Sequence, residues 1–492
     1  VGADANTAVG YDALGANTSG AGNTAVGSNA LLTTTTGGTN TAIGRNALKV
    51  CTGQDNTAVG YASLDASTTA DENTAVGGYA LSALTTGSGC VAVGYNALLT
   101  MTDDTNNTAV GHGALKTADG SGQNTAVGWG AGEATTTAGY NTLVGKDAGT
   151  ALTTGGENVA MGAGALDAAT TGINNTAIGT NSLSTLTTAN TNVAVGYNAL
   201  TVTTTSNTNV AVGAYALDAN TTGGQNTGVG YSALGAVTTG YNNAALGHNA
   251  LAGTSSIGNV AVGAYCAQAV MTGNNNTAMG YYTLAQQTGG HNNTCMGTQA
   301  LYSSTTGDSN TAVGWYSAGE LTTGDNNIFL GKDAGRTGSP GGQVTTGDNE
   351  IYLGDENITA SNIQADWTVA SDKRDKTDVS PLDLGLDFIN KLEPVTYRWD
   401  KRSKYSDDQS VTPDGTYKEE QLEGGFLAQD VEVIENQYGY KQSDKTNLIT
   451  NLSNDGRMYG IKYSKLVPML TKAIQELSAK VEDLEKQLNN KE

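Results

Sequence analysis

The sequence is poor in charge, proline and cysteine. Of its 492 residues only 5 are Pro and 4 are Cys, and charged residues make up 14%, against about 25% in an average globular domain. The four cysteines, Cys51, Cys90, Cys266 and Cys295, lack the spacing of a metal or redox motif. We therefore expect no metal ion and no cofactor, and Cys266 and Cys295 are interpreted as buried free thiols.

Positive charge is scarcer still. Lys and Arg number 24 against 46 Asp and Glu, which gives a formal net charge of -22. A chain this acidic is a poor partner for nucleic acid or an anionic membrane surface. No apolar run reaches the ~18 residues that a membrane span needs, and no signal peptide is visible. We expect neither nucleic-acid binding nor membrane insertion.

The charges divide the chain into two parts. Residues 1–370 contain 6 Lys/Arg and 23 Asp/Glu, whereas the much shorter segment 371–492 contains 18 and 23. The first part is chemically monotonous, and the second has the composition of an ordinary globular domain that ends in a helix. We expect a repeat region at 1–354, a linker at 355–370 and a separate domain at 371–492.

The monotony of the first part comes from one repeated motif. The string NTAVG or a close variant recurs throughout and ends each time at a glycine, from Gly10 to Gly354. The sequence numbers of these glycines rise by 17 at most steps, by 16 at two steps and by 23 at the last. A short fixed period without a helical pattern predicts a mainly β fold: a β-solenoid, or β-roll, with one coil per repeat.

Each position of the repeat suggests a role. Alternation before the Gly predicts a short strand with a bulky face, as at Val9, and a small Ala face. Asn stands four residues before the Gly in all copies except those with Cys90 and Glu350, which suits a coil corner and a ladder of stacked amides. The Ala-Leu pair after the Gly predicts a second strand with Leu inward. A coil this thin buries little surface, so we expect identical copies to pack along the Ala/Gly face.

Aromatic residues often follow the repeat Gly and would form a stripe along the coils. Besides Tyr11, this aromatic stripe comprises Tyr61, Tyr95, Trp129, Tyr197, Tyr231, Tyr281 and Trp315. Packing against neighbouring coils or chains is the favoured interpretation, and binding of sugar faces is the alternative. The three histidines lie several coils apart, which is too far for a shared metal ion.

The motifs NTAVGYNAL and NVAVGYNAL resemble the β-roll of the head domains of trimeric autotransporter adhesins. The resemblance covers residues 1–354 and implies a trimeric β-roll. The period here is longer than in those heads, so their loop shapes and receptor contacts are not expected to carry over.

The C-terminal part carries a second resemblance. The segments SDKRDKTDV (371–379), GLDFINKLEPVTYRW (385–399), GGFLAQDVEVI (424–434) and YGIKYSKLVPMLTKAIQEL (459–477) are expected to form a loop or strand, a helix and strand, a short helix, and a strand leading into a long helix. In order and spacing they resemble the intramolecular chaperone domain of phage tail fibres and tailspikes, including endosialidases. Asp375 departs from the pattern, because that family usually carries an aliphatic residue there.

The resemblance implies assembly of three chains followed by self-cleavage. Ser371 would be the nucleophile, Lys376 the base, and the cut would fall between Ala370 and Ser371. A serine hydroxyl needs a neighbouring base, and a lysine acts as one only after its pKa falls through burial or nearby cations. Asp372 would oppose that fall unless it points away. Without the family pattern, SDKRDK would be interpreted as a solvated charged loop.

The last helix has a heptad pattern. Apolar residues alternate in steps of three and four over 467–488: Val467, Leu470, Ile474, Leu477, Val481, Leu484 and Leu488. They predict a coiled coil. β-Branched residues at a and Leu at d favour two strands, whereas the resemblance to fibre proteins implies three. We expect a homotrimer because the repeat region offers a much longer contact.

Together these features favour a viral tail fibre, a homotrimeric shaft with a self-cleaving assembly chaperone. It would be assembled in the host cytoplasm, reside in the virion, and bind other tail proteins and a host cell-surface glycan or protein. An N-terminal attachment piece would precede Val1. The alternatives are a trimeric cell-surface adhesin, which predicts an anchor after the shaft, and a polysaccharide-degrading tailspike, which predicts an acidic cluster in a groove.

Overall fold

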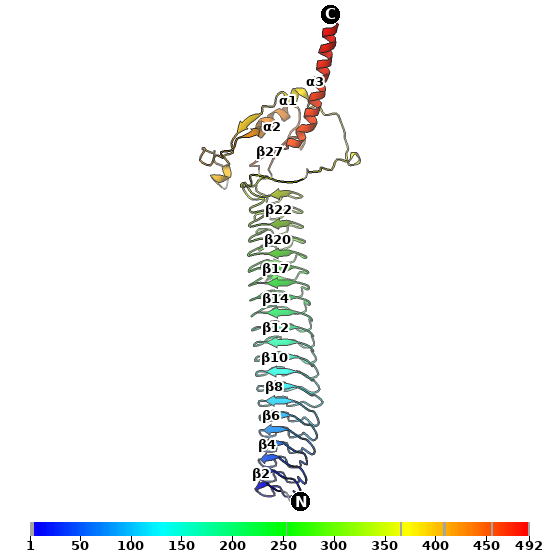
Figure 1. Ribbon diagram of the computed structural model, residues 1–492, viewed down its shortest axis with the longest axis vertical. Coiled ribbons are helices and arrows are strands. Elements are labelled where there is room, and N and C mark those ends of the chain that lie inside the picture. Colours follow the sequence, from blue (N-terminus) through cyan, green and yellow to red (C-terminus); the bar gives the residue numbers. More distant parts are fainter. Residues whose placement is uncertain (1–3, 252, 365–366, 407–409, 454–455, 491–492) are drawn as a thin grey trace. The chain divides into compact units, whose positions relative to one another are not determined.

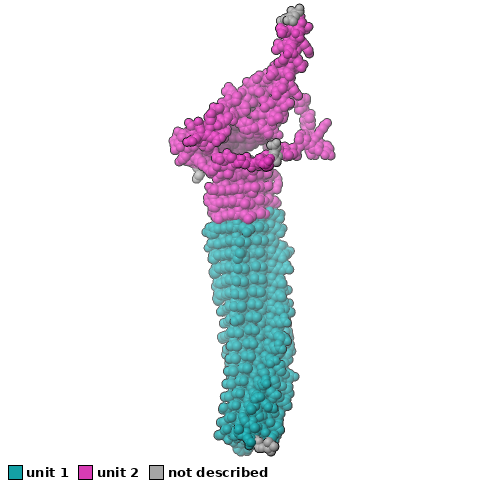
Figure 2. Space-filling view, in the orientation of Figure 1, with its two compact units in different colours: residues 1–293 teal, residues 294–492 magenta. Residues whose placement is uncertain are grey.

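The computed structural model describes residues 4–251, 253–364, 367–406, 410–453 and 456–490. Two compact units are formed, residues 1–293 and residues 294–492 (Figures 1 and 2). The expected linker and C-terminal domain both lie inside the second unit, and residues 365 and 366 of the linker fall outside the described set. Between β23 (Ile351–Leu353) and Lys373, the described residues contain no helix or strand.

The first unit is a parallel β-solenoid, in which each coil contributes one three-residue strand (Figure 1). Its strands are β1 (Thr7–Val9), β2 (Thr24–Val26), β3 (Thr41–Ile43), β4 (Thr57–Val59), β5 (Thr74–Val76), β6 (Val91–Val93), β7 (Thr108–Val110), β8 (Thr125–Val127), β9 (Thr142–Val144), β10 (Val159–Met161), β11 (Thr176–Ile178), β12 (Val193–Val195), β13 (Val210–Val212), β14 (Thr227–Val229), β15 (Ala244–Leu246), β17 (Val260–Val262) and β19 (Thr277–Met279). A two-residue pair, β16 (Gly253–Thr254) and β18 (Val270–Met271), adds a second parallel ladder.

The second unit begins with the same coils. They carry β20 (Thr294–Met296), β21 (Thr311–Val313), β22 (Ile328–Leu330) and β23. Successive strands pair in register, one repeat apart, so that Ala8 lies opposite Ala25 and Val9 opposite Val26. The expected β-solenoid, with one coil for each repeat of the sequence, is therefore confirmed.

The expected direction of the two strand faces is corrected by the structure. The central Ala of each strand, such as Ala25 and Ala42, is fully buried inside the coil. The bulky residue before the Gly points outward instead, and Val9, Ile43 and Met161 are 59%, 41% and 43% exposed. Alternation alone could not tell these faces apart, because both are apolar, and the same buried central position holds Leu143 and Phe329 in other coils. The small face is thus not available for packing between chains.

The asparagine ladder is confirmed. The Asn40 backbone N–H donates to the Asn23 side-chain oxygen at 3.0 Å, and the Asn23 side-chain amide donates to the Gly37 carbonyl at 2.9 Å. The same bonds recur from coil to coil among fully buried asparagines. Even the exceptional Cys90 donates its backbone N–H to Asn73, at 2.9 Å. Each amide side chain thus satisfies buried backbone groups that would otherwise be unpaired.

The second strand is absent among the described residues, although its leucines do point inward. Leu31 and Leu48 are fully buried, but both adopt positive φ values, 48° and 49°, and lie in turns. The Leu31 N–H still donates to the Ala47 carbonyl of the next coil, at 3.1 Å. The backbone therefore makes hydrogen bonds between coils while it is in a left-handed conformation. An Ala-Leu pair in the sequence does not predict that conformation.

The cysteines are free and buried, as expected for Cys266 and Cys295. Burial raises the pKa of the Cys266 thiol to about 12. An undissociated thiol is a poor nucleophile and metal ligand. Cys266 and Cys295 therefore serve as packing groups of the coil interior.

The repeat Gly is required where the strand ends. Gly111 has φ +139°, and a Cβ built there would overlap the Gly128 carbonyl oxygen of the next coil. We predict that Gly111→Ala destabilises the first unit by about 2–3 kcal/mol, since it combines an unfavourable φ with a backbone clash. Thermal unfolding measures the effect. Gly122→Ala is the matched control, because its Cβ would meet only the Thr105 carbonyl oxygen, at 3.6 Å; equal melting temperatures would contradict the prediction.

The remainder of the second unit is a small α+β domain. Its elements are η1 (Lys373–Asp375), α1 (Leu386–Ile389), β24 (Val395–Tyr397), η2 (Arg402–Lys404), β25 (Glu423–Gly425), α2 (Ala428–Gln437), β26 (Thr450–Leu452), β27 (Tyr459–Ile461), η3 (Tyr463–Lys465) and α3 (Leu466–Asn489). The antiparallel pairs are β24–β25 and β26–β27. The helices α1, α2 and α3 and the strands β24 and β27 match those expected from the sequence, with β25, β26 and the three short 3₁₀ turns as additions.

The core of this domain is small. It consists of Leu384, Phe388, Leu392, Val431, Ile449, Leu466 and Met469. Helix α3 contributes its first turns to this core through Leu466 and Met469, and the Glu476 carboxylate accepts a hydrogen bond from the Leu386 N–H at 2.8 Å. The N-terminal half of α3 is therefore fixed to α1.

Candidate functional site

The segment that follows Ala370 forms a tight turn. The Asp372 carboxylate caps η1 by accepting the Arg374 backbone N–H at 2.9 Å, and the Lys376 N–H closes the turn on the Lys373 carbonyl at 3.3 Å. An Asp before a helical turn is a favoured cap because its side chain satisfies an N–H that the turn leaves unpaired. The turn folds the chain back, so residues five apart come together.

The turn brings together the two residues expected to carry chemistry. The Lys376 Nζ lies 2.5 Å from the Ser371 Oγ and donates a hydrogen bond to it. Both residues are exposed, as is Ala370 on the other side of the expected scissile bond. The contact requires only the turn between them, so it is a property of this short segment.

The neighbouring acidic residue is paired away from the lysine. Arg374 holds Asp372 with an ion pair of 2.6 Å, and this hydrogen bond lowers the pKa of the Asp372 carboxyl. Asp372 was expected to stabilise the protonated form of Lys376. Its pairing with Arg374 instead reduces that effect, since the charge is already compensated.

The residues of the aromatic stripe form ladders of contacting rings. In the first ladder Tyr79 and His112 lie between the expected rings, giving the series Tyr61, Tyr79, Tyr95, His112 and Trp129 with centroids 5.2 to 6.1 Å apart. The second ladder is Tyr197, Tyr215, Tyr231, His248, Tyr265 and Tyr281. Trp315 contacts Tyr316 in the second unit.

Most of these contacts are edge-to-face, as between Tyr61 and Tyr79, and the two histidines add stacked pairs. His112 is stacked on both Tyr95 and Trp129, and the Lys146 amine lies 4.8 Å from the Trp129 centroid. The contacts fit the packing interpretation, and binding of a ligand to the stripe stays a prediction. The intervening tyrosines, Tyr79, Tyr215 and Tyr265, were missed because each stands two positions after its Gly, whereas the expected rings stand one position after it.

A buried carboxylate anchors part of the C-terminal domain. The sequence did not indicate this role. Glu435 on α2 is fully buried and accepts backbone N–H groups from Leu448, Ile449 and Thr450 at 2.9, 2.7 and 3.0 Å. The Thr450 hydroxyl adds a fourth bond, of 2.5 Å. Glu435 thereby fixes the segment that leads into β26 against α2.

We predict that Glu435→Ala destabilises this domain by roughly 3 kcal/mol, because it leaves several buried N–H groups without an acceptor. Denaturant unfolding of the full chain measures the effect, followed by the fluorescence of Trp399 in a background in which Trp129, Trp315 and Trp367 are replaced by Phe. Glu420→Ala is the control, since Glu420 is exposed. An unchanged Glu435→Ala transition would mean that the anchor contributes nothing to stability.

The described residues contain no group of His, Cys, Asp and Glu arranged to hold a metal ion. None of the helices within the described ranges combines the length and apolar character of a membrane span.

Comparison with known proteins gives one match. Residues 371–440 match the model of a peptidase family described as chaperone of endosialidase. No curated protein and no solved structure matches the chain. The matched segment begins at Ser371, includes the Ser371–Lys376 contact and extends past Glu435. The C-terminal part is thus similar to a peptidase-type chaperone family, and a β-solenoid followed by such a segment fits an endosialidase-type tail fibre.

Proposed function

We propose that the chain is a homotrimeric tail-fibre shaft whose C-terminal domain drives assembly and then cuts itself off between Ala370 and Ser371. The observation that carries this proposal is the 2.5 Å contact between the Lys376 Nζ and the Ser371 Oγ, at the first residue of the family match. A nucleophile within hydrogen-bond reach of its base is the geometry that serine catalysis requires.

The proposed reaction is an acyl shift followed by hydrolysis. Unprotonated Lys376 takes the Ser371 hydroxyl proton as the Oγ attacks the carbonyl carbon of Ala370. The C–N bond then breaks, Lys376 returns the proton to the Ser371 nitrogen, and an ester joins Ala370 to the Ser371 Oγ. Water attacks the ester and releases the hydroxyl. The net change is one water consumed, with a carboxylate on Ala370 and a free amine on Ser371.

Assembly would switch this reaction on. A lysine becomes an effective base when desolvation or nearby cations favour its neutral form. Ser371 and Lys376 are both exposed in the single chain, so the chain alone supplies little desolvation. A neighbouring chain that covers the turn would supply it, and cutting would then follow correct assembly.

Two apolar surfaces support association of identical chains. Within the first unit, the outward strand residues before the repeat Gly form one surface, in which Val9 and Leu246 are 59% and 52% exposed. The other is the heptad seam of α3, from Val467 to Leu488, whose residues are 45% to 67% exposed. Exposed apolar surfaces on this scale mark sites of association. The composition of the seam alone suits two strands, but the longer shaft surface favours three.

The proposed place of the protein is the virion, where the shaft contacts a host cell-surface glycan or protein as well as other tail proteins. This part of the proposal rests on the fibre-like architecture. The alternatives, a trimeric adhesin and a polysaccharide-degrading tailspike, have no comparable support from the matched family segment.

Intact-mass analysis of the purified full chain over time tests the proposal. We expect the uncut chain to give way to two products, 1–370 and 371–492, whose masses add up to the chain plus one water. A cut at another bond, or a chain that stays whole after it has assembled, would contradict the mechanism.

A further inference from the structure

A second ladder runs along an outer corner of the coils. Its positions lie two residues before each ladder Asn, and we call them the corner row. In most coils where the corner row carries an acceptor side chain, that side chain binds the N–H of the preceding coil. Asp71 accepts the Gln54 N–H at 2.7 Å, and Asn190 accepts the Ile173 N–H at 2.8 Å.

Three consecutive coils leave a gap in this corner row. They carry Gly122, Gly139 and Gly156, and the next coil carries Ile173, so no acceptor side chain is present. Among the described residues, none accepts a hydrogen bond from the N–H groups of these three glycines. Parallel coils are ~4.8 Å apart, so the gap presents a row of free donors at that spacing.

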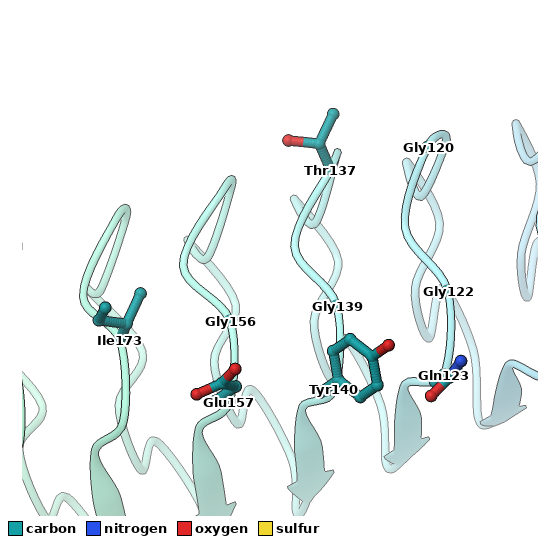
Figure 3. Close-up of a pocket in the computed structure, with 9 residues that line it drawn as sticks. All are labelled: Gly120, Gly122, Gln123, Thr137, Gly139, Tyr140, Gly156, Glu157 and Ile173. Carbon is teal, nitrogen blue, oxygen red and sulfur yellow. The ribbon is translucent and has the colours of Figure 1, made fainter.

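The gap coincides with a shallow groove of about 360 Å³. Tyr140 rises from its middle, with Gln123 and Glu157 in the coils on either side, as Figure 3 shows. Tyr140 is 63% exposed. The same place in most other coils holds a small or polar residue such as Thr39, so the ring is a local departure from the repeat.

A second gap has similar features, although its tyrosine stands in the corner row itself, one position earlier in the coil than Tyr140. The corner row carries Gly224 and then Tyr241, and the N–H groups of both are without an acceptor among the described residues. A groove of about 300 Å³ lies there, lined by Gln225, Tyr241 and hydroxyl side chains. In both grooves a Gln is followed by a Tyr in the next coil. Two independent gaps therefore combine an open ring, a primary amide and free backbone donors.

We propose that these two corner grooves bind pyranose rings of an uncharged glycan. The tyrosine ring would pack on the apolar face of a sugar. The backbone N–H groups would donate to sugar oxygens, while the Gln123 and Gln225 amides and the Glu157 carboxylate would accept from sugar hydroxyls. The inference rests on the proposed attachment role of the shaft and gives that role a ligand class.

Charge restricts the ligand to uncharged sugars. Residues 1–370 carry 23 acidic and 6 basic side chains, so polyanions are repelled at long range. Glu157 adds a carboxylate at the groove itself. The grooves also differ from the aromatic stripe, in which each ring contacts neighbouring rings, as His112 contacts Tyr95 and Trp129.

Gly139→Asn gives the sharpest test. Asn stands at this corner position in other coils, as Asn190 and Asn207 do. The new side chain would accept the Gly122 N–H, which removes one of the three free donors, and would fill the middle of the groove. We expect an unchanged or higher melting temperature together with weaker glycan binding, a combination that misfolding cannot produce.

Binding is measured on the full-length chain with mannan, dextran, galactan and chitohexaose as neutral probes and polysialic acid as the anionic probe. Both grooves contribute, so each change is made with Tyr241→Ala as background. We expect at least a tenfold loss of affinity for the bound neutral probe in Gly139→Asn and Tyr140→Ala. Tyr140→Phe keeps the ring and should stay within threefold of the background.

Several results would overturn the inference. These are binding of none of the neutral probes, preference for polysialic acid, or full binding by both Gly139→Asn and Tyr140→Ala. Loss of binding in Tyr95→Ala alone would assign the ligand to the aromatic stripe instead. Adsorption of the shaft to host cells is measured alongside: adsorption without neutral-glycan binding refutes only the grooves, whereas no adsorption refutes the attachment role itself.

Discussion

Ser371→Ala abolishes the fragment that begins at residue 371. The substitution removes the hydroxyl that attacks the Ala370 carbonyl and leaves the turn intact, because the Asp372 cap and its ion pair with Arg374 do not involve Ser371. Loss of a catalytic nucleophile lowers rates by about a thousandfold or more. The measurement is intact mass of parallel preparations, in which wild type is cut and the variant stays whole.

The base is tested in the same way. Lys376→Met keeps a similar length but cannot accept a proton, so cutting should fall as far as in Ser371→Ala. Lys373→Met is the matched control: Lys373 is an exposed lysine of the same turn, and no described ion pair involves it. Were the 371–492 fragment to persist in Ser371→Ala or in Lys376→Met, the Ser–Lys mechanism would be wrong.

Ile474→Asp separates the chains. Ile474 is 65% exposed at the centre of the α3 seam, and a trimer would bring three new carboxylates together in an apolar core. An unpaired buried charge costs several kcal/mol, and each 1.4 kcal/mol lowers association about tenfold. Sedimentation of Ile474→Asp in the uncut Ser371→Ala background should show weaker association than the background alone.

Gln475→Asp is the control for this change. Gln475 is exposed and neighbours the seam residue, so it introduces the same charge on the same helix without entering the seam. The Ile474→Asp change with Ser371 present should also slow cutting, since the exposed Ser371–Lys376 pair depends on assembly for its desolvation. Unimpaired association in Ile474→Asp would exclude the seam as an interface.

The fold of the shaft was predictable from the repeat, because a motif that keeps its spacing over many copies requires each copy to form one coil stacked on the last. Asn23 and Asn40 had to stack once each repeat formed one coil. Which strand face points inward did not follow, since Val26 and Ala25 are both apolar and alternation with a period of two does not tell the two faces apart. Leu31 was correctly placed inside, but its left-handed φ has no signal in an Ala-Leu pair.

The Ser371–Lys376 contact was predictable because it is local and because the family pattern singles it out. Glu435 was not, because a Glu in a polar helix is ordinarily solvated. Its burial arises only when Leu448, Ile449 and Thr450 fold back onto α2 and point their N–H groups at it. The corner grooves escaped notice for the opposite reason: they result from missing side chains at Gly122, Gly139 and Gly156.

Sedimentation equilibrium of uncut Ser371→Ala tests the central claim, that the shaft and the α3 seam hold identical chains together. The account predicts a particle of three times the chain mass, with Ile474→Asp shifted toward smaller species. A particle with the mass of one chain at micromolar concentration would contradict it, because the exposed strand residues and the α3 seam would then have no partner.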